Sequence, residues 1–158
     1  GPSRATVATE PIYLIVSQGD DSFAAGSNSG LTTFEVTRVA VGSGALGAWT
    51  VQGNALPVGR RTHGHGALLW ADFVWVLPGV NSETRGAEPT PIASTVMRVP
   101  FDIAATDPAQ VLGMYQSSAA TFAVNRCYYG TARLNAYVWA VAGNNGTGPI
   151  GSIERIPE

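Results

Sequence analysis

The feature that most constrains this fold is an internal repeat. Three short apolar runs, rich in β-branched and aromatic residues, each end in a glycine, at Gly19, Gly79 and Gly143. The first two glycines are 60 residues apart and the last two are 64 residues apart. A loop rich in Gly, Ser, Asn and Pro follows each run, and a second β-rich run then begins, at residues 33–39, 94–99 and 152–156. Self-similarity at a fixed period indicates a fold built from repeated structural units.

Further matches extend the repeat beyond these hairpins. The segment 46–49, Leu-Gly-Ala-Trp, aligns with the segment 112–115, Leu-Gly-Met-Tyr. An arginine followed by a β-branched residue recurs in the second runs, at Arg38, Arg98 and Arg155. Other aligned sets are Arg60 with Arg126, His63 with Tyr129, Gly66 with Gly130, and Trp75 with Trp139. We therefore expect structural roles in the repeat for Gly19, Gly79, Gly143, Arg60, Arg126, Trp49, Tyr115, Trp75 and Trp139.

Each period reads as four strands separated by turn signals. In the middle unit the predicted strands are residues 62–70, 73–79, 94–101 and 111–116, where β-branched and aromatic residues dominate. Four antiparallel strands per repeat form the blade of a β-propeller. A β-sandwich of short strands is the rival interpretation, but a sandwich has no reason to repeat its sequence at this period.

The sequence therefore predicts an all-β propeller segment of about three four-stranded antiparallel blades. The blades cover about residues 4–52, 62–116 and 126–157, within a single domain of residues 4–158. We treat residues 1–3 as the remnant of an expression tag, because Gly1-Pro2 has the form of a protease-cleavage scar.

The order of these marks resembles the kelch repeat. Each unit has Arg-x-x-His or its counterpart, then an aromatic-containing strand ending in Gly, then a Val-rich strand, then Trp or Tyr. Residues 42–49, followed by Leu56-Pro57-x-x-Arg60-x-x-His63, look like the kelch-type units of large secreted bacterial and phage structural proteins. One departure is that the Gly-Gly doublet of the family is reduced to Gln18-Gly19, Pro78-Gly79 and Ala142-Gly143.

The resemblance implies a six- or seven-bladed propeller that binds proteins or glycans outside the cell, at a cell surface or in a virion. Three blades do not close a ring, and an open stack would expose faces that neighbouring blades normally bury. We expect either that protomers or sister chains complete the ring, as three plus three in a dimer, or that further chain completes it. Assembly is the preferred alternative, because a lone open stack would be poorly soluble.

Composition excludes two classes of partner. The formal net charge is −2, all nine basic residues are arginine, and no basic cluster exceeds the pair Arg60-Arg61. A nucleic-acid or anionic-membrane surface needs a basic stripe. No apolar run approaches the roughly 20 residues that span a bilayer. We therefore expect neither a nucleic-acid partner nor membrane insertion.

No catalytic constellation stands out, so we expect a non-enzymatic module without a cofactor. The chain has no Gly-x-Ser-x-Gly elbow and no phosphate-binding Gly loop that runs into a lysine. His63 and His65 would share a face of a strand, but two ligands need further partners to hold a metal, so we favour packing. The alternative function is a fragment of an extracellular kelch-fold enzyme, galactose-oxidase-like or glycan-acting. Cys127-Tyr128 invites that comparison, although a buried thiol beside strand aromatics explains it more simply.

The long loops between the second and third strands are the expected ligand-binding surface. They cover residues 20–31, 80–93 and 144–150, and such loops emerge on one face of a propeller. The alternative for Asp20, Asp21 and Asn145 is turn chemistry, with a type I′ turn at Asn145-Gly146. The candidate residues in the three loops are Asp20, Asp21, Phe23, Asn28, Asn81, Glu83, Arg85, Asn144 and Asn145.

Overall fold

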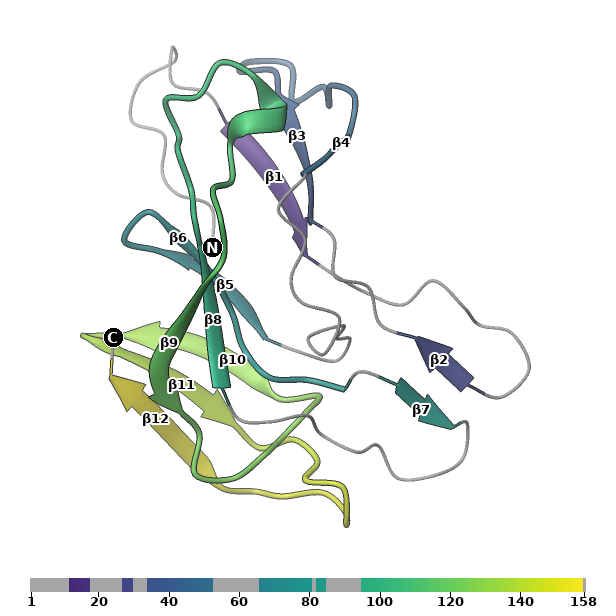
Figure 1. Cartoon of the computed structure of the whole chain (residues 1–158), viewed down its shortest axis with the longest axis vertical. Helices are drawn as coiled ribbons and strands as arrows, with labels where there is room; N and C mark the ends of the chain where they lie inside the picture. Colours follow the sequence, from purple (N-terminus) through teal and green to yellow (C-terminus); the bar gives the residue numbers. More distant parts are fainter. Residues whose placement is uncertain are drawn as a thin grey trace.

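The computed structural model shows an all-β chain made of three small antiparallel sheets (Figure 1). It describes residues 12–17, 27–29, 34–52, 66–80, 82–84 and 95–157. Within these residues there is no α-helix; the only helical turn is the 3₁₀ segment η2, Pro108–Gln110. None of the described segments is a helix long and apolar enough to cross a membrane. The three sheets follow one another along the molecule in chain order, and their described strands form no closed ring.

Strand order within each sheet follows the sequence repeat, but among the described residues only the second sheet has the four strands predicted for a blade, and the first and third have three. The first sheet is β1 (Ile12–Ser17), β3 (Phe34–Val39) and β4 (Thr50–Val51). The second is β5 (Ala67–Trp70), β6 (Phe73–Val76), β8 (Thr95–Pro100) and β9 (Gln116–Thr121). The third is β10 (Gly130–Leu134), β11 (Tyr137–Val141) and β12 (Ile153–Pro157). In addition, β2 (Ser27–Ser29) pairs with β7 (Ser82–Thr84).

Two pairs of equivalent hydrogen bonds confirm alignments made from the sequence. The indole Nε1 of Trp75 donates to Trp70 O at 3.2 Å, and that of Trp139 donates to Leu134 O at 3.3 Å. The same holds for two aligned glycines. Gly47 N donates to Arg38 O at 2.8 Å, and Gly113 N donates to Pro100 O at 2.9 Å.

The alignment of Arg38 with Arg98 and Arg155 is wrong by two residues. Arg98 and Arg155 lie opposite Trp75 and Trp139, the aligned aromatic residues. Arg38 instead lies opposite Tyr13, and Val36 occupies the place of Arg98 in the first sheet. A shift of two keeps a side chain on the same face of a sheet. The hydrophobic pattern is therefore satisfied in either register, and it could not reveal the shift.

The last strand of the middle unit also differs from the prediction of residues 111–116, because β9 begins only at Gln116. Leu112 makes an isolated pair with Phe101, and continuous pairing resumes at Arg98 with Gln116. Between these two pairs, the β8 side has Val99 and Pro100, whereas the opposite side has one residue more, 113–115. Pro100 has no N–H to donate to a ladder. The predicted strand at residues 62–70 is described only from Gly66 onward.

The sheets stack face to face around two apolar cores. We call the side of a sheet that packs against the preceding sheet its rear face, and the opposite side its forward face. The forward face of the first sheet (Phe34, Val36) packs on the rear face of the second (Val74, Val76, Val99). The forward face of the second sheet (Trp75, Leu77, Val96) packs on the rear face of the third (Val138, Ala140, Ile156). The middle sheet is thus buried on both sides, and for that reason β6 reads as a continuous apolar run.

Buried polar groups tie neighbouring sheets together. Gln52, directly after β4, donates from Nε2 to Pro108 O at 2.8 Å and accepts from Leu112 N at 3.3 Å. Tyr129 donates from its hydroxyl to Pro78 O at 2.5 Å. Because each bond joins segments more than 50 residues apart, it fixes one sheet against the next.

Candidate functional site: the two outer sheet faces

The forward face of the third sheet is not covered by another described sheet; its aliphatic residues are exposed and its aromatic residues are half-buried. Successive residues of a strand point to opposite faces, so Tyr137, Trp139 and Val141 lie on the face opposite the buried Val138 and Ala140. Cross-strand partners share a face, which adds residues of β10 and β12. Leu134 is 60% exposed and Ile153 is 62% exposed. This C-terminal outer face consists of Leu134, Tyr137, Trp139, Val141, Ile153 and Arg155.

An arginine caps the aromatic residues of this face. The guanidinium carbon of Arg155 lies 4.3 Å from the centre of the Tyr137 ring and 5.7 Å from that of Trp139. The two rings meet edge to face, with centroids 6.4 Å apart. Such contacts are attractive because the ring faces carry negative charge. The face therefore combines apolar area with a positive charge held in place by aromatic rings.

The second sheet carries the same arrangement in a buried position. The guanidinium carbon of Arg98 lies 4.6 Å from the centre of the Phe73 ring and 5.8 Å from that of Trp75. There the third sheet covers the aromatic residues, and Trp75 is only 2% exposed. The same constellation is thus an interface inside the chain and an open surface at the C-terminal end of the stack.

The rear face of the first sheet is the other open surface. Leu14 and Val51 are 45% and 59% exposed. Leu46 pairs with Val39, which lies opposite Ile12, so these residues share the rear face. The corresponding face of the second sheet is buried in the first core. We call Ile12, Leu14, Val39, Leu46 and Val51 the N-terminal outer face. Two polar residues lie on the same side of the sheet, Glu35 opposite Val51 and the buried Thr37 opposite Leu14.

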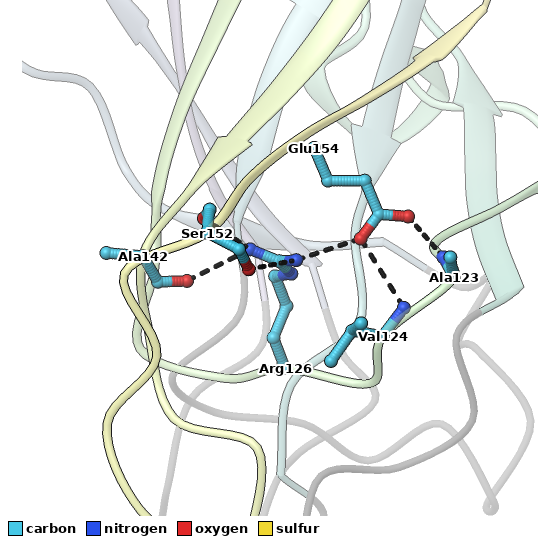
Figure 2. A network of polar contacts seen from close by, with 6 residues as sticks. All are labelled: Ala123, Val124, Arg126, Ala142, Ser152 and Glu154. Carbon is cyan, nitrogen blue, oxygen red and sulfur yellow. Dashed lines mark hydrogen bonds and ion pairs between the residues drawn. The ribbon is translucent and has the colours of Figure 1, made fainter.

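A buried arginine network holds the third sheet in shape (Figure 2). Arg126 is 1% exposed, and its Nη2 makes an ion pair with Glu154 at 2.8 Å. Its Nη1 donates to Ala142 O at 3.1 Å and to Ser152 O at 3.2 Å. Glu154 in turn accepts from the backbone N–H groups of Ala123 and Val124. The network links the segment before β10 to β12.

Gly143, but not Gly79, depends on a backbone conformation that favours glycine. Gly143 has a φ of +108°, whereas Gly79 is not among the described residues with positive φ.

The remaining residues predicted to have roles in the repeat lie in different surroundings. Tyr115 packs on the first core and Trp49 is exposed. Gly19 and Arg60 lie outside the described residues.

The structure brings two of the three predicted loops together. The β2–β7 pairing places Asn28 opposite Glu83 in the backbone register. In Figure 1 the 144–150 loop lies at the bottom, apart from this pair at the right. Of the other candidates, Asp20, Asp21, Phe23, Asn81 and Arg85 lie outside the described residues, as do the metal candidates His63 and His65.

Asn144 and Asn145 use their side chains in local turns. Asn144 Oδ1 accepts from Gly146 N at 2.7 Å, and Asn145 Oδ1 accepts from Thr147 N at 3.0 Å. The predicted type I′ turn at Asn145-Gly146 is wrong. Gly146 has positive φ but Asn145 does not, and Asn145 N donates to Gly148 O. The turn residues are therefore Gly146 and Thr147.

Sequence reasoning missed the two outer faces. It singled out Trp139 for the repeat, but not Tyr137, Leu134, Ile153 or Arg155 as members of one exposed surface. Strand alternation carries the signal, because both faces of β11 are apolar. A strand that is apolar on both faces predicts a covering layer on each side.

Comparison with known proteins gives no match, either to a protein-family model or to a curated protein sequence. The kelch resemblance therefore stays a prediction.

Proposed function

We propose that this chain is a non-enzymatic binding and assembly module, a segment of a kelch-like β-propeller. Its sheets serve as blades, and its two outer faces are contact surfaces for further blades of the same kind. The observation that carries the proposal is an arginine stacked on two aromatic rings, which occurs on two sheets. The group around Arg98 is covered by the third sheet, and the equivalent group around Arg155 is not covered by another described sheet. Contiguous exposed apolar surface on a folded protein marks a site of interaction.

The stacked order of the sheets supports a scaffold role. Each sheet packs its forward face on the rear face of the next, as in repeat proteins whose units contact only their neighbours. In keeping with the kelch resemblance, we place such a module outside the cell, at a cell surface or in a virion. Its partner there is protein, either a second copy or a sister chain.

The paired loops support a second contact region on the same module. Because β2 and β7 join two loops that follow equivalent strands, they form part of a composite surface, which we propose as the site for a protein or glycan ligand. A panel of immobilised glycans tests the glycan case. Binding that Asn28→Ala and Glu83→Ala abolish supports it, and binding that both variants retain contradicts it.

Size-exclusion chromatography with light scattering tests the assembly proposal. The chain mass is 16.4 kDa, and the expected result is a larger species whose fraction grows with protein concentration. A mass equal to one chain at every concentration would contradict the proposal.

A further inference from the structure

We infer that the C-terminal outer face of one copy binds the N-terminal outer face of a second copy, head to tail. The inference rests on the proposed function and names its partner and its geometry. The occupant follows from the repeat, because inside the chain the forward faces of the first and second sheets are each covered by the rear face of the following sheet.

The two open faces are the unmatched halves of that pattern. The third sheet exposes a forward face, on which Tyr137, Trp139 and Arg155 occupy the places of Phe73, Trp75 and Arg98. The first sheet exposes a rear face, on which Leu14 occupies the place of Val74, a residue of the first core. A second copy therefore supplies the kind of surface that covers the second sheet.

The contact between the second and third sheets shows which kinds of side chain a contact between two copies would require. Between the second and third sheets, apolar residues of β11 and β12 lie over the aromatic residues of β6. Arg133 of β10 also stacks on Trp70 of β5, with its guanidinium carbon 4.1 Å from the ring centre. The N-terminal outer face offers aliphatic side chains in the corresponding role, and Glu35, opposite Val51, places a carboxylate on the same side of the sheet.

Geometry also fixes the class of assembly. A contact between two different patches is heterologous, and it forms a closed ring when the rotation between copies closes. Where the rotation closes after two copies, the ring has six sheets and each copy uses both outer faces; where it does not close, the copies continue as an open chain. A contact of the C-terminal outer face with itself would leave the N-terminal outer face unused.

One substitution in each face tests the geometry. Leu14→Glu changes the N-terminal outer face and Ile153→Glu changes the C-terminal outer face. A carboxylate in the centre of an apolar contact is expected to raise the dissociation constant about 30-fold or more in either variant. Met114→Glu is the matched control, because Met114 is 73% exposed and belongs to neither face; it should leave assembly unchanged. Far-ultraviolet circular dichroism checks that each variant is folded.

Mixing the two face variants gives the decisive measurement. Leu14→Glu keeps an intact C-terminal outer face and Ile153→Glu keeps an intact N-terminal one. An equimolar mixture therefore forms one unmodified contact and should give a heterodimer by light scattering, at concentrations where each variant alone is monomeric.

The outcomes separate this inference from the proposed function. If the unmodified chain assembles but Leu14→Glu assembles equally well, the contact is not head to tail and this inference fails while the assembly module stands. If the folded variants lose assembly and the mixture does not recover it, the inference also fails. If the unmodified chain never assembles, both proposals fail.

Discussion

Gly143→Ala is expected to destabilise the third sheet strongly, for two separable reasons. Gly143 has a φ of +108°, and an added Cβ would lie 2.7 Å from Cys127 O and 2.9 Å from Tyr129 Cβ. Positive φ costs a residue with a side chain about 1–2 kcal/mol, and overpacking a tight site costs about 1–3 kcal/mol. Neither neighbour yields easily, because Cys127 O accepts a hydrogen bond from Asn144 N at 2.9 Å and Tyr129 is buried in the second core. We therefore expect a loss of about 3 kcal/mol in the free energy of unfolding.

Three other glycines separate the two contributions. Gly42 has a φ of +94° with nothing within 4 Å of an added Cβ, so Gly42→Ala reports backbone strain alone. Gly66 has ordinary φ, but a Cβ there would overlap the Thr131 methyl and lie 3.0 Å from a Leu77 methyl, so Gly66→Ala reports contact alone. Gly151 has neither feature, and Gly151→Ala should be neutral or stabilising by up to about 1 kcal/mol.

Denaturant and thermal unfolding followed by tryptophan fluorescence measure all four variants at one protein concentration, because assembly makes stability depend on concentration. For a chain of this size 1 kcal/mol corresponds to about 2–4 °C, so Gly143→Ala should lower the midpoint by about 6–12 °C. A Gly143→Ala midpoint equal to that of Gly42→Ala would refute the argument from contact. Equality of both with Gly151→Ala would refute the argument from strain as well.

Three further predictions concern contacts between and within sheets, and denaturant unfolding checks each of them. Tyr129→Phe removes the buried hydroxyl that donates to Pro78 O and should cost about 1–3 kcal/mol, because the carbonyl loses its partner; no change in midpoint would show that water replaces the bond. Gln52→Leu removes the bonds to Pro108 O and Leu112 N and should by itself lower the free energy of unfolding by about 1–3 kcal/mol. Ala71→Gly should raise the free energy of unfolding by about 1 kcal/mol, because Ala71 has a φ of +49° in the β5–β6 turn; a lower midpoint would mean that the alanine methyl makes a contact worth more than the strain.

The repeat was predictable from the sequence because the pattern of each β-hairpin does not depend on neighbouring sheets. Each β-hairpin needs an apolar run, a turn and a second run, so the strand order within the sheets could be read from composition along the chain. The equivalent hydrogen bonds of Trp75 and Trp139 confirm that alignment. The register of Arg38 was not predictable, because a shift of two residues preserves the face.

Turn types were less predictable, because the chain uses residues that carry weak turn signals. Ala71 and Asp72 both have positive φ in the two-residue turn that joins β5 to β6, yet alanine gives no signal for that conformation. The Asn145-Gly146 pair gives a strong signal, but the turn lies one residue later. Asn145 instead accepts hydrogen bonds from the N–H and hydroxyl of Thr147, and this local side-chain bond competes with the turn that the dipeptide favours.

The outer faces show why function was harder to infer than fold. Trp75 and Trp139 have the same place in the repeat, the same indole hydrogen bond and the same arginine opposite them. Only the presence of a following sheet makes one an interior residue and the other part of a surface, and the aligned residues of the repeat do not show whether another sheet follows. The strand pattern does record the requirement, because β11 is apolar on both faces although the described chain covers only one of them. The part of an apolar side chain that stays in contact with water gives the isolated sheet no hydrophobic stabilisation, and that area lowers the free energy only when another surface removes it from water. The composition of that face is therefore the physical reason for the proposal that it binds another surface.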